Sequence, residues 1–290
     1  MTGDWGRIER GTTSIIDFER AEDWLMGSYP RVLIGTDGSV DSAIAVDVGS
    51  TIAARLGVPV SILTVWTGDD NVPGSRDYEW AKSVTDNAEE LVTGRGVSDV
   101  TGEQLSGKPE EELLRVATEQ PETLLVVGGR GLTKASSRVS GSVSNRLSHH
   151  SPADVLFAQG PLRESGARVG LTTDGSVTSR LAVRRGLELA LALGATPHVV
   201  TVAKDQGEGE RLMGASLGEL GIDVPDVTPE RDILIGVLPA KALIDAASNY
   251  DIMVIGNRSM SGPSRLLGSI ANKVTHGVEG NLLLVNTSSE

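Results

Sequence analysis

The feature that most constrains the fold of this chain is an internal repeat. The segment 137–149 (SRVSGSVSNRLSH) matches the segment 264–276 (SRLLGSIANKVTH), and the stretch 36–40 (TDGSV) recurs unchanged at 173–177. Both matches keep their order along the chain, so the sequence is a tandem duplication. A duplication within 290 residues, of which 39% are hydrophobic, favours two domains of ordinary size, each with its own core.

The repeats set the expected domain boundaries. We expect an N-terminal extension over residues 1–28, a first domain over 29–160, a linker over 161–166 and a second domain over 167–290. The linker is short and rich in turn-forming residues, so it would keep the two halves in contact. The extension has apolar residues near helical spacing, which predicts one short amphipathic helix.

Within each half, apolar runs alternate with segments of helical periodicity. The first half predicts strands at 31–35, 60–66, 100–105, 124–127 and 155–157, with helices ending before Gly57 and at 78–93, 110–119 and 142–149. The second half predicts strands at 169–172, 199–202, 232–235, 252–255 and 282–285, with helices at 178–193, 240–249 and 269–276. This alternation predicts an α/β fold with a mostly parallel sheet that is covered on both faces.

A glycine-rich loop in the first half predicts a phosphate site. Gly128 and Gly131 directly follow an apolar strand, and Gly141 with Ser142 opens the next predicted helix. The first turn of a helix leaves backbone N–H groups without partners and is the positive end of the helix dipole, so an anion would bind there. The alternative is structural: Gly128 ends a strand and Gly131 forms a turn.

The glycine loop, together with the Asp-Gly-Ser at 37–39, resembles the motif of the universal stress protein family in its tandem two-domain, ATP-binding form. The resemblance covers the chain from about Tyr29 onward, and it implies two five-stranded, Rossmann-like domains that form a pseudo-dimer. It also implies that the last strands, 155–157 and 282–285, pair across the two halves. ATP would bind with its phosphates in the glycine loop and its adenosine near the first two strands.

The resemblance assigns a nucleotide site in the first half. Thr36 and Asp37 would contact the adenosine, and Val65 would lie against the adenine. The phosphates would contact the loop and the start of the helix, at Gly128, Arg130, Gly131, Gly141, Ser142 and Val143. The chemistry of these residues agrees, because a carboxylate accepts from ribose hydroxyls, a guanidinium neutralises phosphate charge and a hydroxyl donates to phosphate oxygens. For Asp37 the alternative is a turn residue or a helix N-cap.

The second half retains only part of this pattern. The corresponding residues of a second, weaker site are Asp174, Val202, Gly256, Arg258, Gly268 and Ser269. Ser259 replaces the second glycine, and the loop is one residue shorter. A Cβ at that position would crowd backbone that must pass close to the ligand, so a second nucleotide is left open.

Composition and charge argue against several other classes of protein. A net charge of −13 argues against a nucleic-acid-binding face, and the absence of cysteine excludes disulfides, thiolate nucleophiles and cysteine-rich zinc sites. No signal peptide and no sufficiently long apolar segment is recognisable, so we expect a cytoplasmic protein without a membrane partner. The neighbouring His149 and His150 would point apart on a helix, which favours a structural role over a metal site.

Three functions fit these observations. The first is an ATP-binding regulatory protein of the stress response, with or without Mg²⁺, whose shape or partner binding follows the nucleotide. The second is a slow ATPase or a self-phosphorylating enzyme that uses Ser142, and the third is a nucleotide-free scaffold for other proteins. We favour the first. The sequence has no Ser-His-Asp order, no positioned general base and no obvious set of magnesium ligands, which argues against an enzyme, and the intact first glycine loop argues against a nucleotide-free scaffold. Homodimer formation and the identity of protein partners are left open.

Overall fold

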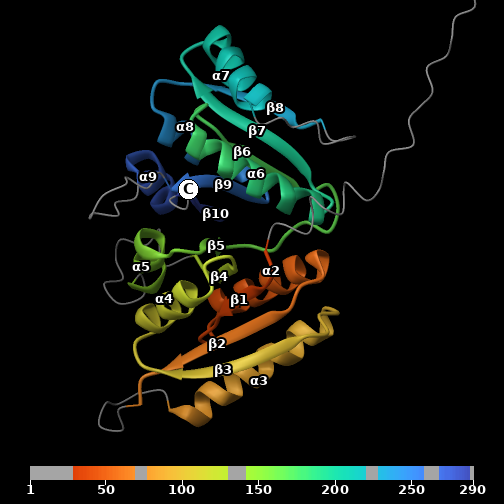
Figure 1. The fold of residues 1–290 in the computed structure, drawn as a ribbon, viewed down its shortest axis with the longest axis vertical. Helices are drawn as coiled ribbons and strands as arrows, with labels where there is room; N and C mark the ends of the chain where they lie inside the picture. The colour runs from red at the N-terminus through yellow and green to blue at the C-terminus, as the bar shows by residue number, and fades with distance from the viewer. Residues whose placement is uncertain (1–28, 69–76, 130–141, 220–227, 258–267, 288–290) are drawn as a thin grey trace, which may run out of the picture.

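The computed structural model describes residues 29–68, 77–129, 142–219, 228–257 and 268–287 (Figure 1). The strands are β1 (Val32–Gly35), β2 (Val60–Trp66), β3 (Val100–Ser106), β4 (Leu124–Gly128), β5 (Asp154–Ala158), β6 (Arg168–Thr172), β7 (Thr196–Ala203), β8 (Glu230–Ile235), β9 (Ile252–Asn257) and β10 (Asn281–Asn286). The helices are α2 (Val40–Leu56), α3 (Tyr78–Gly94), α4 (Pro109–Glu119), α5 (Ser142–His150), α6 (Val177–Ala192), α7 (Gln206–Glu219), α8 (Pro239–Ala246) and α9 (Ser269–Gly277), with a 3₁₀ turn η1 (Ala247–Asn249) after α8.

The ten strands of the described residues form one sheet in the order β3-β2-β1-β4-β5-β10-β9-β6-β7-β8. Pairing is parallel within the N-terminal repeat (β1–β5) and within the C-terminal repeat (β6–β10), and antiparallel only where β5 meets β10. Leu282 lies opposite Phe157 in that pair, and Leu284 lies opposite Val155. The predicted α/β fold and the pairing of the last strands are therefore confirmed, whereas the domain boundaries stay a prediction.

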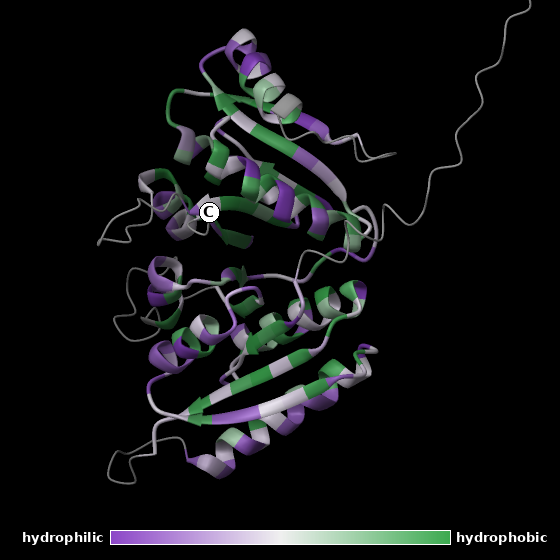
Figure 2. Ribbon diagram, viewed as in Figure 1, coloured by the Kyte–Doolittle hydropathy of each residue, from purple (hydrophilic) through white to green (hydrophobic). Residues whose placement is uncertain are grey.

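Helices cover both faces of the sheet. Successive side chains of a strand point to opposite faces: Val32 and Ile34 of β1 pack in one hydrophobic cluster and Leu33 in the other. The first cluster receives side chains from α2, α3, α6 and α7, and the second from α4, α5, α8 and α9. Each cluster includes residues of both repeats, so the two cores continue across the β5–β10 pair. Figure 2 shows the matching pattern, with largely hydrophobic strands and helices of mixed hydropathy.

Buried polar groups fasten the two repeats together beside the β5–β10 pair. The Asp154 carboxylate accepts a hydrogen bond from the Tyr29 hydroxyl at 2.7 Å and another from the Asn286 backbone N–H at 2.7 Å. Burial raises the pKa of Asp154, and these two hydrogen bonds partly oppose that shift. Near the other end of the pair, the Asn281 side-chain oxygen accepts from the backbone N–H of Gln159 at 2.8 Å. The last strands of the two repeats, β5 and β10, are thus joined near both ends by specific hydrogen bonds.

Helices α5 and α9, which carry the strongest repeat motif, lie next to each other midway along the long axis of the molecule, at its left edge in Figure 1. The rings of His149 and His276 lie 6.1 Å apart between centroids, and His276 Nε2 lies 3.0 Å from the side-chain oxygen of Asn145. Burial, and then the neighbouring His276 and His150, lower the pKa of His149. Within the described ranges, no group of three or more acidic, histidine or cysteine side chains is arranged to hold a metal ion.

One helix was absent from the predicted elements. Helix α7 follows β7, in the segment where the sequence predicts no helix, and its residues QGEGERLMGASLGE include four glycines. Glycine is disfavoured in helices, and only a few apolar residues mark the buried face, so periodicity alone gives a weak signal. The predicted helix in the extension lies outside the described residues. Of the helices that are described, none has both the length and the apolar character needed to cross a membrane.

Candidate functional site

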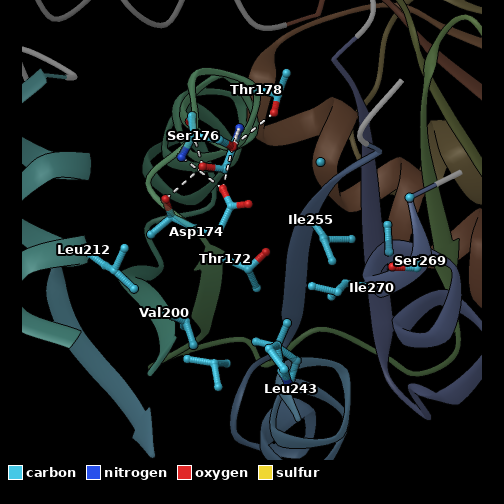
Figure 3. A pocket seen from close by; sticks show the side chains of 17 residues that line it. Thr172, Asp174, Ser176, Thr178, Val200, Leu212, Leu243, Ile255, Ser269 and Ile270 are labelled. Carbon is cyan, nitrogen blue, oxygen red and sulfur yellow. Dashed lines mark hydrogen bonds between the residues drawn. The ribbon is translucent and has the colours of Figure 1, made fainter. Parts of the chain in front are cut away.

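A cavity of about 200 Å³ opens in the C-terminal repeat, at the carboxyl ends of β6 and β9 (Figure 3). These two strands are neighbours in the sheet, although the chain runs from β6 through β7 and β8 before it returns to β9. The strand order therefore reverses between them. Such reversal points are where open α/β sheets bind ligands, because the loops on either side diverge and leave a crevice.

Polar residues form the side of the cavity next to β6. Asp174 follows β6, and its Oδ1 atom accepts from the backbone N–H of Ser176 at 3.0 Å. Ser176 is the N-cap of α6 and accepts from the backbone N–H of Ser179 at 3.2 Å. Gly175 between them has φ +80°, a left-handed conformation that glycine adopts without strain. The turn thereby places a carboxylate at the cavity wall.

Aliphatic side chains form most of the remaining wall. They come from β7, α7, α8, β9 and α9, and Figure 3 shows Leu212 and Val200 on one side and Ile255 and Ile270 on the other. Among the described residues, the apolar set is Val200, Val202, Leu212, Pro239, Leu243, Ile255, Ile270 and Ala271. Apolar walls of this kind favour the apolar part of a ligand.

The first turn of α9 closes the cavity opposite Asp174. Its N-cap residue is Gly268, which has no side chain to accept a hydrogen bond from the first turn. Gly268, Ser269 and Ile270 all line the cavity. The backbone N–H groups at a helix N-terminus and the positive end of its dipole favour an anionic group there. The cavity therefore has a carboxylate on one side and an anion-favouring helix start on the other.

A set of hydroxyl groups lies directly beneath the Asp174 turn. Thr173 Oγ1 is 2.8 Å from Ser216 Oγ of α7 and 3.0 Å from Ser179 Oγ of α6. It also accepts from the backbone N–H of Gly175 at 3.1 Å. Ser216 in turn donates to the carbonyl oxygen of Leu212 at 2.9 Å. The turn is thus linked by side-chain hydrogen bonds to two helices.

The N-terminal repeat has a similar turn after β1. Asp37 Oδ1 accepts from the backbone N–H of Ser39 at 3.1 Å, and the buried Thr36 donates to Ser42 Oγ at 3.0 Å. The turn role that we considered for Asp37 is therefore present, while the N-cap of α2 is Ser39. Ser144 of α5 donates to the carbonyl oxygen of Gly128 at 2.9 Å, which ties the start of that helix to the end of β4.

The predicted site residues have different outcomes in the structure. Those of the C-terminal repeat that are described line one cavity: Asp174, Val202, Gly256, Gly268 and Ser269. Those of the N-terminal repeat that are described are Thr36 and Asp37 after β1, Val65 in β2, Gly128 at the end of β4, and Ser142 and Val143 at the start of α5. Arg130, Gly131, Gly141 and Arg258 lie outside the described residues. Whether any of them binds a nucleotide stays a prediction.

Sequence reasoning missed several lining residues, above all Leu212, Leu243 and Thr178. Leu212 belongs to the helix that was not predicted. Leu243 and Thr178 belong to helices that were predicted, but which of their faces meets the strand ends depends on the sheet order. The repeat offers one signal. A motif residue in one half marks the corresponding position in the other half, and the residues next to that position then become candidates.

Comparison with known proteins agrees with this architecture. The model of the universal stress protein family matches residues 28–159. Universal stress protein Rv2005c from Mycobacterium tuberculosis is 25% identical over 300 residues, which is 90% of this chain and 100% of that protein. Rv1636 from the same organism is 30% identical over 142 residues, or 46% of this chain and 97% of the relative.

A solved structure extends the likeness in fold to nearly the whole chain. The crystal structure of a universal stress protein from Archaeoglobus fulgidus has a TM-score of 0.70 and 20% identity, and the match covers 89% of this chain and 99% of that one. Rv1636 is matched over almost its entire length, so about half of this chain corresponds to nearly the whole of that relative. The chain therefore belongs to the universal stress protein family.

Proposed function

We propose that this chain is a nucleotide-liganded regulatory protein that binds ATP in the cavity of its C-terminal repeat. One observation carries the proposal. The Asp174 turn and the first turn of α9, whose N-cap is Gly268, face the same largely aliphatic cavity at a reversal of strand order. Occupancy would alter the shape of the protein or its binding to partners in a stress response.

The residues of the cavity suit the parts of an adenylate. The aliphatic walls would enclose the adenine, and the Asp174 carboxylate would accept from a ribose hydroxyl. The phosphates would lie at the N-terminus of α9, where anions are favoured. A volume of about 200 Å³ is below the usual range for whole ligands, so it suits the nucleoside part, with the phosphates extending beyond it. Mg²⁺, if bound, would be held largely by phosphate oxygens.

The proposal extends to the N-terminal repeat on the basis of the sequence motif. Asp37 would take the role of Asp174, and Gly128, Arg130 and Gly131 would form the phosphate loop. Both sites would act by binding alone, because neither motif supplies an evident general base. The protein would then hold ATP without consuming it.

Calorimetric titration of the nucleotide-free full chain with ATP tests the proposal. Asp174→Asn keeps an oxygen for the Ser176 N–H but loses the negative charge, so it should weaken ATP binding about tenfold. Asp245→Asn is the matched control, since Asp245 lies on the exposed face of α8 and pairs with Lys241. It should leave the affinity unchanged.

The outcomes separate the competing functions. If nucleotide-free protein takes up no ATP, or if Asp174→Asn binds as tightly as the wild type, binding at this cavity is refuted. ATP recovered intact after long incubation supports a liganded regulator. Continued phosphate release, or a phosphorylated protein, would instead favour an enzyme.

A further inference from the structure

Helix α7 has an unusual composition for a helix in this fold. Glycine occupies positions 207, 209, 214 and 218 of its 14 residues. Each glycine in a helix interior is disfavoured about fivefold relative to alanine. Short isolated helices are already marginal in water. The helical state of α7 must therefore depend on its contacts with the rest of the domain.

Those contacts divide between the core and the cavity. Met213 is 1% exposed and belongs to the hydrophobic cluster, and Gly209 lies so close to Ile233 that a Cβ there would overlap it. Leu212, by contrast, is half-buried and lines the cavity. Part of the apolar contact that stabilises α7 therefore forms only when a ligand fills that cavity.

A hydrogen-bonded link joins α7 to the Asp174 turn. Ser216 Oγ lies 2.8 Å from Thr173 Oγ1, and Thr173 directly precedes Asp174. Ser216 also donates to the carbonyl oxygen of Leu212, one turn earlier in the helix. The turn and the backbone of Leu212, the α7 residue that lines the cavity, are thus connected through one serine.

This link differs between the repeats. In the N-terminal repeat, Gly38 corresponds to Gly175, and the α3 side chain closest to it is Val84, which takes the place of Leu212. The residue four positions after Val84 is Ala88, which has no hydroxyl. Thr36, the counterpart of Thr173, bonds to Ser42 of its own turn and helix. Within the ranges that the structure describes, the serine–threonine link from this turn to the outer helix is seen in the C-terminal repeat.

We propose that α7 is a ligand-coupled helix: a molecule in the cavity contacts Leu212 and holds the Thr173–Ser216 link, which suppresses local opening of α7. This inference rests on the proposed function, since it takes the ligand to be ATP. Its consequence is that the surface of α7 would report whether the cavity is occupied. The solvent face of α7, with Glu210 and Arg211 exposed, would be presented in helical form when the cavity is filled.

Hydrogen–deuterium exchange of the full chain, with and without ATP at about 100 times its Kd, tests the coupling. If α7 must be helical for ATP to bind, bound ATP lowers the population of the locally unfolded helix. Amides that exchange through this local unfolding should then exchange up to about 100-fold more slowly. Leu212→Ala and Ser216→Ala should each reduce that slowing at equal fractional occupancy. Titration calorimetry sets the occupancy for every variant independently.

Gly214→Ala checks that exchange in α7 reports helix opening. A Cβ at position 214 meets nothing within 4 Å, so this change adds helix propensity without a clash. It should slow α7 exchange about fivefold in the absence of ATP. Unchanged exchange in this variant would show that α7 does not open locally, and the inference would be overturned.

The two proposals fail in different ways. If ATP binds and protects the first turn of α9 but leaves α7 exchange unchanged, the coupling is wrong while the nucleotide site stands. If calorimetry detects no ATP binding, the proposed function and the coupling are both wrong.

Discussion

The hydrogen bond between Tyr29 and Asp154 makes a sharp prediction about the buried carboxylate that also accepts from Asn286 of the other repeat. Asp154 is 7% exposed, and its carboxylate has the Tyr29 hydroxyl at 2.7 Å as one donor. Tyr29→Phe removes that donor with almost no change of shape. Hydrogen bonds to charged groups contribute roughly 1.5–3 kcal/mol, so the free energy of unfolding at pH 7 should fall by about 2 kcal/mol.

The loss should vary with pH in a defined direction. Burial raises the pKa of Asp154 above 3.8, and the Tyr29 bond opposes this by favouring the charged form. The contribution of that bond is therefore fully present at neutral pH and is lost as the pH falls through the pKa of Asp154 in the folded protein. The variant and the wild type should converge in stability in acid.

Urea unfolding followed by circular dichroism measures the difference. Tyr78→Phe is the control, because Tyr78 is 45% exposed, and it should stay within about 0.5 kcal/mol of the wild type. Both repeats share the two hydrophobic clusters, so we expect one cooperative transition. A Tyr29→Phe change below about 0.5 kcal/mol, or two separate transitions in the wild type, would refute the reasoning.

Three further predictions concern stability. The pKa of His149 is lowered, so its neutral form is preferred in the folded state. Unfolding titrations should therefore show that the free energy of unfolding falls as the pH drops below 6.5, and His149→Gln should make it depend less steeply on pH. Burial raises the pKa of Glu188, and within the described part of the chain its Oε2 atom has no hydrogen-bond partner, so Glu188→Gln should raise the free energy of unfolding in urea, and a lower value than the wild type would contradict this. A Cβ at Gly186 would lie 2.5 Å from Leu171 Cδ2, so Gly186→Ala should cost about 1–3 kcal/mol in the same assay, unlike the uncrowded Gly214→Ala.

Most elements were predictable because local chemistry marks their ends. The predicted strand 60–66 matches β2, an apolar run bounded by turn residues. The predicted stop of the first helix at Gly57 is confirmed, because Gly57 has φ +67° and caps α2. The β5–β10 pairing was correctly expected from the family resemblance rather than from the residues themselves.

The site was predictable only where a motif recurs. Asp174, Gly256 and Gly268 could be assigned from the repeat, and all three line the cavity. Leu212 could not, because the helix that carries it has little apolar periodicity and many glycines. Its role depends on long-range packing of α7 against the sheet, which no local pattern encodes.

The contact between α5 and α9 bears on how two binding events in one chain would relate. Each helix begins where a glycine-rich segment ends, and the two touch through His149 and His276 on one side of the sheet. Because this contact lies toward the C-terminal ends of both helices, a phosphate group that shifts one helix would also shift the packing of its neighbour. Two nucleotides in this molecule would then bind with unequal affinities, because the first would change the affinity for the second.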